Sequence, residues 1–336
     1  MTEYDVLTIG NAIVDIIAQA DDDFLIAQAV QKGGMTLIET ARARQLYDAM
    51  GPAVETSGGS AANTVAGVVS LGGTGAYIGK VANDELGTIF THDIRAQKVR
   101  YETTPLEGEP PTARSMILVT PDGERSMSTY LGACVELGPE DIDEALVAAA
   151  KLTYFEGYLW DPPRAKEAIL KAASIAHANG REVAMSLSDA FCVHRYRKEF
   201  LDLLQSGTVD IVFANESEVL ALYETDDVEL AIRRIAKDAR RLAAVTRGDE
   251  GCVAVSGAET VAVPAVALAR LLDTTGAGDL FASGFLRGHT DGLGLEDSAR
   301  LGAVAAGHII EQIGPRPQQQ LAKLPGAKEI LDRIAG

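Results

Sequence analysis

Short runs of apolar residues alternate along this chain with longer segments in which apolar residues recur every three or four positions. The short runs have the length of strands, and several end in Gly, Asn or Asp; the longer segments have the period of helices with one buried face. The strand-like runs are residues 5–9, 152–155, 183–187, 210–214 and 242–246, and the helical segments include residues 163–178, 216–223, 228–239 and 279–286. This alternation predicts an α/β fold with a mainly parallel central sheet covered by helices on both faces.

Three further segments interrupt the alternation. Residues 34–37, 114–119 and 124–130 have strand patterns, and Pro121-Asp122-Gly123 between the last two is typical of a hairpin turn. We expect a small β element that projects from the main sheet as a lid, made of approximately residues 11–50 and 99–133. Because no repeat or long linker divides the chain, residues 1–336 are predicted to form a single domain with the lid inserted in it.

Composition narrows the classes of partner. Apolar residues make up 47% of the 336 residues and charged residues 23%, as in ordinary globular proteins with a sizeable core. The net charge of −18, from 30 Lys+Arg and 48 Asp+Glu, argues against a nucleic-acid partner. Neither a membrane-spanning run nor a basic signal segment is visible. Three widely spaced cysteines (Cys134, Cys192 and Cys252) suit buried thiols in a reducing compartment. We therefore expect a cytoplasmic monomer or homodimer.

The strongest chemical signal is a turn of small residues that runs directly into a helical pattern at residues 273–285. Gly276, Ala277 and Gly278 let backbone N–H groups converge, and at a helix N-terminus such donors form an anion site. Phosphoryl transfer needs this arrangement, because charge accumulates on the oxygens of the transferred group. Asp279 stands at the edge of the turn, where a carboxylate can take the proton of an attacking hydroxyl. The alternative is a Gly-rich helix start with Asp279 as a cap.

Two common nucleotide-binding loops do not fit. Lys80 follows Gly79 but is followed by Val81, so a Walker A loop is not formed. Phe281 stands where the third glycine of a dinucleotide-binding fingerprint is required.

Two other segments suit a polyhydroxylated ligand. In residues 57–64 the paired glycines Gly58 and Gly59 allow a close approach of the backbone, and Asn63 offers a donor and an acceptor on the first turns of a helix. Asp15 lies among apolar neighbours, where a buried carboxylate needs partners that sugar hydroxyls can supply. The alternatives are a tight turn with a helix-start Asn63, and an Asp15 that is satisfied by backbone amides.

Polar residues also follow two of the later strands. Asn215 and Glu218 place oxygens at a carboxyl-end position that suits a hydrated Mg²⁺ with its phosphates, although an ordinary helix cap has the same pattern. Thr246 and Gly248 follow the next strand and can meet phosphates in the same way.

Together these segments resemble the ribokinase-like (PfkB) family of carbohydrate and nucleoside kinases, in order and spacing, from about Tyr4 to Pro317. Residues 58–63 are similar to the first signature of the family, residues 273–285 to its second, and residues 215–218 to its Asn-x-x-Glu motif. The resemblance implies a ribokinase-like three-layer sandwich with a small β lid. It also implies an ATP-dependent kinase that uses Mg²⁺, with K⁺ activation near Asp273 and Thr275.

The resemblance also implies individual roles. Asp279 is expected to be the catalytic base, and Gly276, Ala277 and Gly278 the anion hole. Sugar or ribose hydroxyls are expected at Asn11, Asp15, Gly59 and Asn63, the ATP phosphates at Asn215, Thr246 and Gly248, Mg²⁺ near Glu218, and the ATP base near His308.

Residues 123–126, 154–158 and 185–191 are more similar to the adenosine kinase branch than to ribokinase. The favoured reaction on this similarity is phosphorylation of the CH₂OH group of adenosine to give AMP. Arg125 then reaches the phosphates from the lid, and Phe191 either stacks on the base or belongs to the core. The alternatives are a kinase for ribose, a ketose or a sugar acid, and a catalytically silent regulator that binds a nucleotide or sugar.

Overall fold

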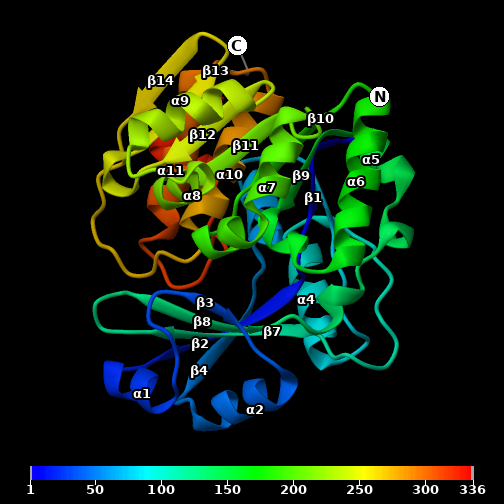
Figure 1. Cartoon of the computed structure of the whole chain (residues 1–336), viewed down its shortest axis with the longest axis vertical. Helices are drawn as coiled ribbons and strands as arrows, with labels where there is room; N and C mark the ends of the chain where they lie inside the picture. Colours follow the sequence, from blue (N-terminus) through cyan, green and yellow to red (C-terminus); the bar gives the residue numbers. More distant parts are fainter. Residues whose placement is uncertain (1, 334–336) are drawn as a thin grey trace.

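The computed structural model describes residues 2–333, and the larger part of it is a nine-stranded sheet with helices on both faces (Figure 1). The strand order is β14-β13-β12-β11-β10-β9-β1-β5-β6, and only the pairings of β13 with its neighbours are antiparallel. The strands are β1 (Tyr4–Ile9), β5 (Gly75–Ile78), β6 (Arg100–Tyr101), β9 (Ala150–Glu156), β10 (Glu182–Ser186), β11 (Ile211–Asn215), β12 (Leu242–Thr246), β13 (Cys252–Ser256) and β14 (Glu259–Val263). The predicted mainly parallel sheet is confirmed.

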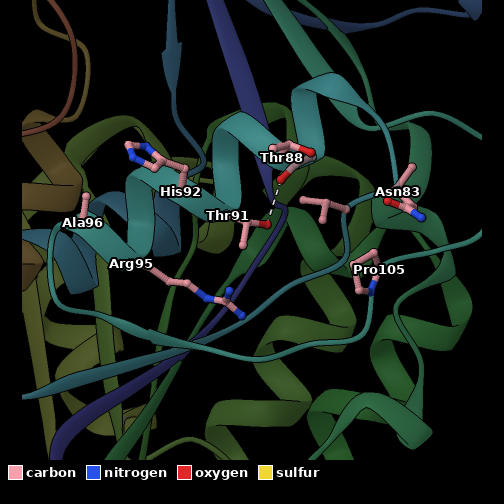
Figure 2. Close-up of a pocket in the computed structure, with 10 residues that line it drawn as sticks. Asn83, Thr88, Thr91, His92, Arg95, Ala96 and Pro105 are labelled. Carbon is pink, nitrogen blue, oxygen red and sulfur yellow. Dashed lines mark hydrogen bonds between the residues drawn. The ribbon is translucent and has the colours of Figure 1, made fainter.

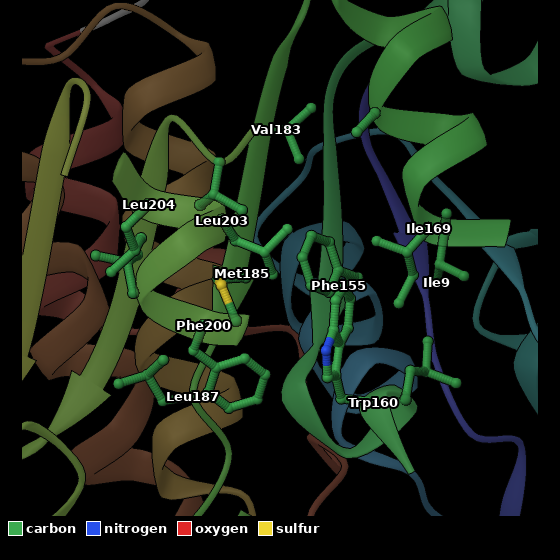
Figure 3. Packing of buried hydrophobic residues seen from close by; sticks show 14 of the residues in the cluster. Ile9, Phe155, Trp160, Ile169, Val183, Met185, Leu187, Phe200, Leu203 and Leu204 are labelled. Atoms are coloured by element: carbon green, nitrogen blue, oxygen red, sulfur yellow. The ribbon is translucent and has the colours of Figure 1, made fainter. Parts of the chain in front are cut away.

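Helices cover both faces of this sheet, as its continuous apolar strands require. One layer contains α5 (Glu144–Ala149), α6 (Pro163–Ala178), α7 (Ala190–Gln205), α8 (Glu216–Tyr223) and α9 (Val228–Asp238). The other contains α3 (Ser60–Ser70), α4 (Glu85–Ala96), α10 (Ala277–Thr290) and α11 (Leu295–Ile309), with α12 (Pro325–Leu331) packed on α11. In the first layer Phe155 of β9 stacks on Trp160, with ring centroids 6.1 Å apart, and Phe200 of α7 lies close by (Figure 3).

A second sheet lies below the first in Figure 1 and has the order β3-β8-β7-β2-β4. Its strands are β2 (Ile13–Gln19), β3 (Met35–Leu37), β4 (Ala53–Ser57), β7 (Ala113–Val119) and β8 (Arg125–Tyr130). Helices α1 (Asp22–Ala27) and α2 (Thr40–Ala49) cover its outer face. The three predicted strands of this element are confirmed, whereas β2 and β4 were not predicted.

The two faces of the second sheet have different surroundings, because successive side chains of a strand point to opposite faces. Ile16 of β2 and Met116 of β7 pack with residues of α1 and α2. Asp15 and Ile117, one residue away from each, line a cavity on the inner face. The sequence therefore places a carboxylate on an otherwise mainly apolar inner face.

Candidate active site

A cavity of about 970 Å³ lies where the carboxyl ends of the parallel strands meet the inner face of the second sheet. Most of the predicted site residues line this one cavity: Asn11, Asp15, Gly59, Asn63, Arg125, Asn215, Glu218, Thr246, Gly248, Thr275, Gly276, Ala277, Gly278 and Asp279. Four predicted residues are absent from its lining: Gly58, Phe191, Asp273 and His308. Segments that are far apart in the sequence thus converge at the edge where ligands bind in open α/β sheets.

The turn before α10 has an open helix start. Gly276 caps the helix in a left-handed conformation with φ of 80°, and a Cβ there would lie 2.8 Å from Cβ of Pro315, so glycine is required. The first bond within the helix runs from the Leu280 N–H to the Gly276 carbonyl. The N–H groups of Gly278 and Asp279 precede it, and open space adjoins the Gly278 Cα. Within residues 2–333 neither of these two N–H groups has a hydrogen-bond acceptor, so both can meet an anion.

The Asp279 carboxylate is held by the first turn of α3. It accepts hydrogen bonds from Ser60 Oγ at 2.6 Å and from Asn63 Nδ2 at 3.0 Å. Burial raises the pKa of Asp279, and the two hydrogen bonds oppose this rise. Ser60 was not predicted as a site residue, although it stands three positions before Asn63 and so shares its helix face.

Asp15 is a buried carboxylate with unused hydrogen-bonding capacity. Its exposed fraction is 6%, and within residues 2–333 no hydrogen bond reaches it. Burial raises the pKa of Asp15 to about 7, and the positive charges of Arg316 and Arg125 oppose this rise. Gly58 shapes the site from outside the cavity lining, because a Cβ there would lie 2.0 Å from Asp15 Oδ2. The carboxylate oxygens of Asp15 can therefore accept hydrogen bonds from the hydroxyl groups of a ligand.

Glu156, at the end of β9, joins two of the loops that line the cavity. It accepts hydrogen bonds from Asn11 N at 3.0 Å, from Asn11 Nδ2 at 2.8 Å and from Ala61 N at 2.7 Å. The Asn11 Oδ1 atom is buried and has no hydrogen-bond partner within residues 2–333. Glu156 was not predicted as a site residue, although a carboxylate directly after an apolar strand is a recognisable signal.

Arg125 of β8 connects the second sheet to the turn before α10. Its Nε donates to Thr274 Oγ1 at 3.3 Å and lies 3.7 Å from Asp273 Oδ1. Asp273 is buried and accepts from the N–H groups of Thr275, at 2.8 Å, and Gly314, at 3.0 Å. Arg125 thus lies next to the predicted anion hole.

At the carboxyl end of β11, Asn215 and Glu218 form the capping box of α8. Asn215 Oδ1 accepts from the Glu218 N–H at 2.9 Å, while Glu218 accepts from Asn215 N at 3.0 Å and from Asn215 Nδ2 at 2.7 Å. Gly248 has φ of 57° and open space beside its Cα. His308 does not line the cavity and lies 3.1 Å from Gln319 Nε2, whereas its neighbour Gly307 does line it.

Phe191 does not belong to the core, and its stacking on the base stays a prediction. Its side chain is 46% exposed, so it is not a core residue, and it lies beside Gly34 of the second sheet's connecting loop and outside the cavity lining. The aromatic residues that do line the cavity are Tyr158, Phe213 and Phe281. Tyr158 was not predicted as a site residue; its hydroxyl donates to the Ser188 carbonyl at 3.3 Å.

Comparison with known proteins identifies the family. The sequence model described as pfkB family carbohydrate kinase matches residues 35–321. The chain belongs to this family. This pfkB-family kinase therefore transfers phosphate from ATP to a hydroxyl group.

Solved structures resemble this kinase over its whole length. Adenosine kinase from Sinorhizobium meliloti is 64% identical, with a TM-score of 0.94 and complete coverage of both chains. A probable sugar kinase from Rhizobium etli CFN 42 is 62% identical, with a TM-score of 0.96, over 98% of this chain and 100% of the other. Adenosine kinase from Schistosoma mansoni, solved with 2-fluoroadenosine, is 27% identical, with a TM-score of 0.85, over 95% and 99% of the two chains. The ribokinase-like fold and the adenosine kinase-like branch are confirmed.

A smaller hollow of about 520 Å³ lies between α4 and the chain around Pro105 (Figure 2). None of the predicted site residues lines it. Within residues 2–333 no helix has the length and apolar character to cross a membrane, and no three His, Cys, Asp or Glu side chains gather as metal ligands.

Three buried carboxyl groups of the kinase are expected to make its stability depend on pH. Burial raises the pKa of Asp15 and Glu156 to about 7 and that of Glu218 to about 8. Because these values exceed those of the unfolded chain, the folded protein binds more protons between about pH 4.5 and pH 8, and stability falls as pH rises through this window. We expect a lower Tm at pH 8 than at pH 6 by differential scanning calorimetry.

Glu218→Gln tests the contribution of one of these groups. Gln can still accept from the Asn215 backbone N–H and complete a capping box, so the variant keeps the helix start. It loses the titrating proton and one acceptor, the one that receives Asn215 Nδ2. Its Tm is expected to fall less between pH 6 and pH 8 than that of the wild type. Glu216→Gln, on the same turn of α8 but half exposed, is the matched control and is expected to keep the wild-type slope. Equal slopes for the wild type and Glu218→Gln would contradict the assignment.

Proposed function

We propose that this kinase phosphorylates the 5′-CH₂OH group of a nucleoside, with adenosine as the preferred acceptor and AMP as the product. The proposal depends on one observation, the two-sided character of the cavity. Asn63 of α3 and Asp279 of α10 supply polar groups on one side, and the second sheet supplies apolar side chains together with Asp15 on the other. These apolar residues are Ile13, Met35, Leu37, Ile117 and Met127. A purine ring can bury its faces against them, whereas a plain sugar would leave them in contact with water.

The relatives support the same acceptor. The Sinorhizobium meliloti protein is described as an adenosine kinase, and the Schistosoma mansoni enzyme was solved with an adenosine analogue. The description of the Rhizobium etli protein as a probable sugar kinase favours the second candidate, a sugar kinase on the same scaffold.

We assign the roles as follows. The ribose hydroxyls form hydrogen bonds with Asp15, Asn11 and Asn63. These bonds direct the CH₂OH group at Asp279. Asp279 takes the hydroxyl proton as the new oxygen–phosphorus bond forms and the bond to the ADP oxygen breaks. The N–H groups at the end of the turn from Gly276 to Gly278 stabilise the charge on the moving phosphoryl oxygens, with Arg125 beside them. The Ala277 N–H already donates to the Thr274 carbonyl at 3.2 Å, so Gly278 and the following Asp279 supply the free donors.

The ATP phosphates are assigned to Asn215, Thr246 and Gly248, and the ATP base to the region near His308 and Gly307. Mg²⁺ neutralises phosphate charge in this chemistry. Glu218 is suited to contact Mg²⁺ through a water molecule, because both of its carboxylate oxygens already accept hydrogen bonds from Asn215. We also propose K⁺ activation near Asp273 and Thr275, and equal rates with and without K⁺ would remove that assignment.

The second sheet is proposed to act as a lid that closes over the acceptor and excludes water, which discourages wasteful ATP hydrolysis. A single domain with this lid inserted, a cytoplasmic location, and a monomeric or homodimeric state stay predictions.

An acceptor panel tests the proposed function. ADP formation is measured with adenosine, ribose, fructose and a keto-deoxy sugar acid at equal concentrations, in the presence of Mg²⁺. We expect the highest kcat/KM for adenosine, because only a nucleoside uses both sides of the cavity. A preference for fructose or a sugar acid would support the sugar kinase, and no ADP above background with any acceptor would indicate a silent regulator.

A further inference from the structure

The loop after α11 connects the two halves of the active site. The Gly314 N–H donates to Asp273 Oδ2 at 3.0 Å, and Pro315 packs on Gly276 so closely that a Cβ on Gly276 would clash. The next residue, Arg316, turns to the other side and contacts α3 and α4. One short segment thus contacts the anion hole and the acceptor-binding residues together.

Arg316 is a buried cation whose hydrogen-bond partners are all neutral. Its exposed fraction is 7%, and its guanidinium donates to the Gly58 carbonyl at 3.1 Å, to Asn63 Oδ1 at 3.4 Å and to Gln97 Oε1 at 3.4 Å. It also lies over the Phe90 ring, 5.5 Å from the centroid. Within residues 2–333 no carboxylate forms an ion pair with it, and burial lowers the pKa of Arg316 to about 10. Keeping an unpaired charge in the interior is costly, so a purely structural role would be better served by an apolar residue.

The contact with Asn63 determines how that side chain faces the catalytic base. An amide has an accepting oxygen at one end and a donating nitrogen at the other. Because Arg316 occupies the oxygen, the nitrogen is left to donate to Asp279 Oδ2. With the amide reversed, its oxygen would face the Asp279 carboxylate, and the two would repel.

The charge of Arg316 also acts on Asp15. The charged groups around Asp15 are Arg316, Arg125 of β8, and the carboxylates of Asp273 and Asp279. Among them Arg316 exerts the largest effect that favours the ionised form of Asp15. Without Arg316, the two carboxylates of Asp273 and Asp279 and only one positive group, Arg125, would remain around Asp15.

We propose that Arg316 is a positioning residue for phosphoryl transfer: it fixes the Asn63 amide, and through it Asp279, and keeps Asp15 ionised for the acceptor hydroxyls. The inference rests on the proposed function, since it concerns the same acceptor site. Arg316 does not line the cavity, so it acts through Asn63, Gly58 and Asp15 and does not touch the acceptor.

Arg316→Met tests the proposal, because Met keeps the length and apolar stem and removes the guanidinium. We expect kcat/KM for adenosine to fall at least ~10-fold, as for the loss of charged hydrogen bonds. The acidic limb of its pH profile should move to higher pH, while the ATP KM stays at the wild-type value. Arg316→Lys keeps the positive charge that acts on Asp15 but lacks the planar guanidinium that holds Asn63. It should therefore restore the adenosine KM more than kcat. Arg300→Met, at an exposed arginine of α11, is the matched control.

The outcomes separate the proposed function from the positioning role of Arg316. A wild type that prefers another acceptor overturns the proposed function, and the variants are then assayed with that acceptor. Wild-type kcat/KM and pH profile in Arg316→Met overturn the positioning role, as does an activity loss explained by a fallen Tm and a smaller folded fraction. Failure of both Arg316 variants to fold shows a structural role and also overturns it. A wild type that is inactive with every acceptor overturns both claims.

Discussion

Replacing Asp279 by Asn will lower kcat at least ~10²-fold while the protein still folds and binds ATP, which is the scale of a lost general base. Asn has the shape of Asp and can still accept a hydrogen bond from Ser60 Oγ, which lies 2.6 Å from the Asp279 carboxylate. It cannot take the proton of the acceptor hydroxyl. Steady-state kinetics with adenosine give kcat, and isothermal titration calorimetry gives the affinity for ATP.

The control for this prediction is Asp297→Asn, which removes a carboxylate that pairs with Arg333 on the surface. It is expected to keep the wild-type kcat, because Asp297 does not line the cavity. Near-native turnover of Asp279→Asn would refute the base assignment. A loss of ATP affinity as large as the loss of kcat would show that Asp279 acts in binding.

The parts of the site that the sequence predicts well are local. Asp279 and the turn from Gly276 to Gly278 belong to one run of residues, and a helix start determines their geometry. The contacts that orient Asp279 are not local, since Ser60 lies 219 positions away from it. They depend on the packing of α3 on α10, where a Cβ on Gly67 would lie 2.3 Å from Ser283 Oγ. No pattern in either segment alone predicts that close approach.

The second sheet shows a different limit of sequence reasoning. Strand β2 has apolar residues on both faces, so the alternation that marks a half-buried strand is missing. Strand β4 is a short edge strand whose first residues are exposed. Because strand β2 was not predicted, Asp15 could be recognised as buried but could not be assigned to one face of the second sheet. Phe191 and Tyr158 show the same limit, because only the packing of α7 and the chain after β9 decides which ring lines the cavity.

Replacing Asp15 by Asn is expected to lower kcat/KM for adenosine at least ~10-fold, and by up to ~10⁴-fold if both bonds are lost, through KM for the acceptor. Each hydrogen bond to a charged acceptor contributes about 1.5–3 kcal/mol, and we assign two to the Asp15 carboxylate. Asn can accept at only one of its two terminal atoms, so at least one of the two bonds is lost. KM for ATP should not change, because the ATP phosphates are assigned to Asn215, Thr246 and Gly248, which lie at or just after the ends of β11 and β12 and not on β2. Initial rates at varied adenosine and ATP separate the two constants.

The pH dependence tests the same carboxylate independently. Burial raises the pKa of Asp15 to about 7, so acidification protonates it and removes an acceptor for hydroxyls. The adenosine KM of the wild type should therefore rise as pH falls through 7, and that of Asp15→Asn should not, because the variant has no proton to gain at this position. Glu55→Gln, at an exposed carboxylate on the adjacent strand β4, is the control and should keep the wild-type profile. If Asp15→Asn keeps both the wild-type KM and its rise in acid, the acceptor hydroxyls bind elsewhere, because a carboxylate that receives them cannot lose its charge without weakening their binding.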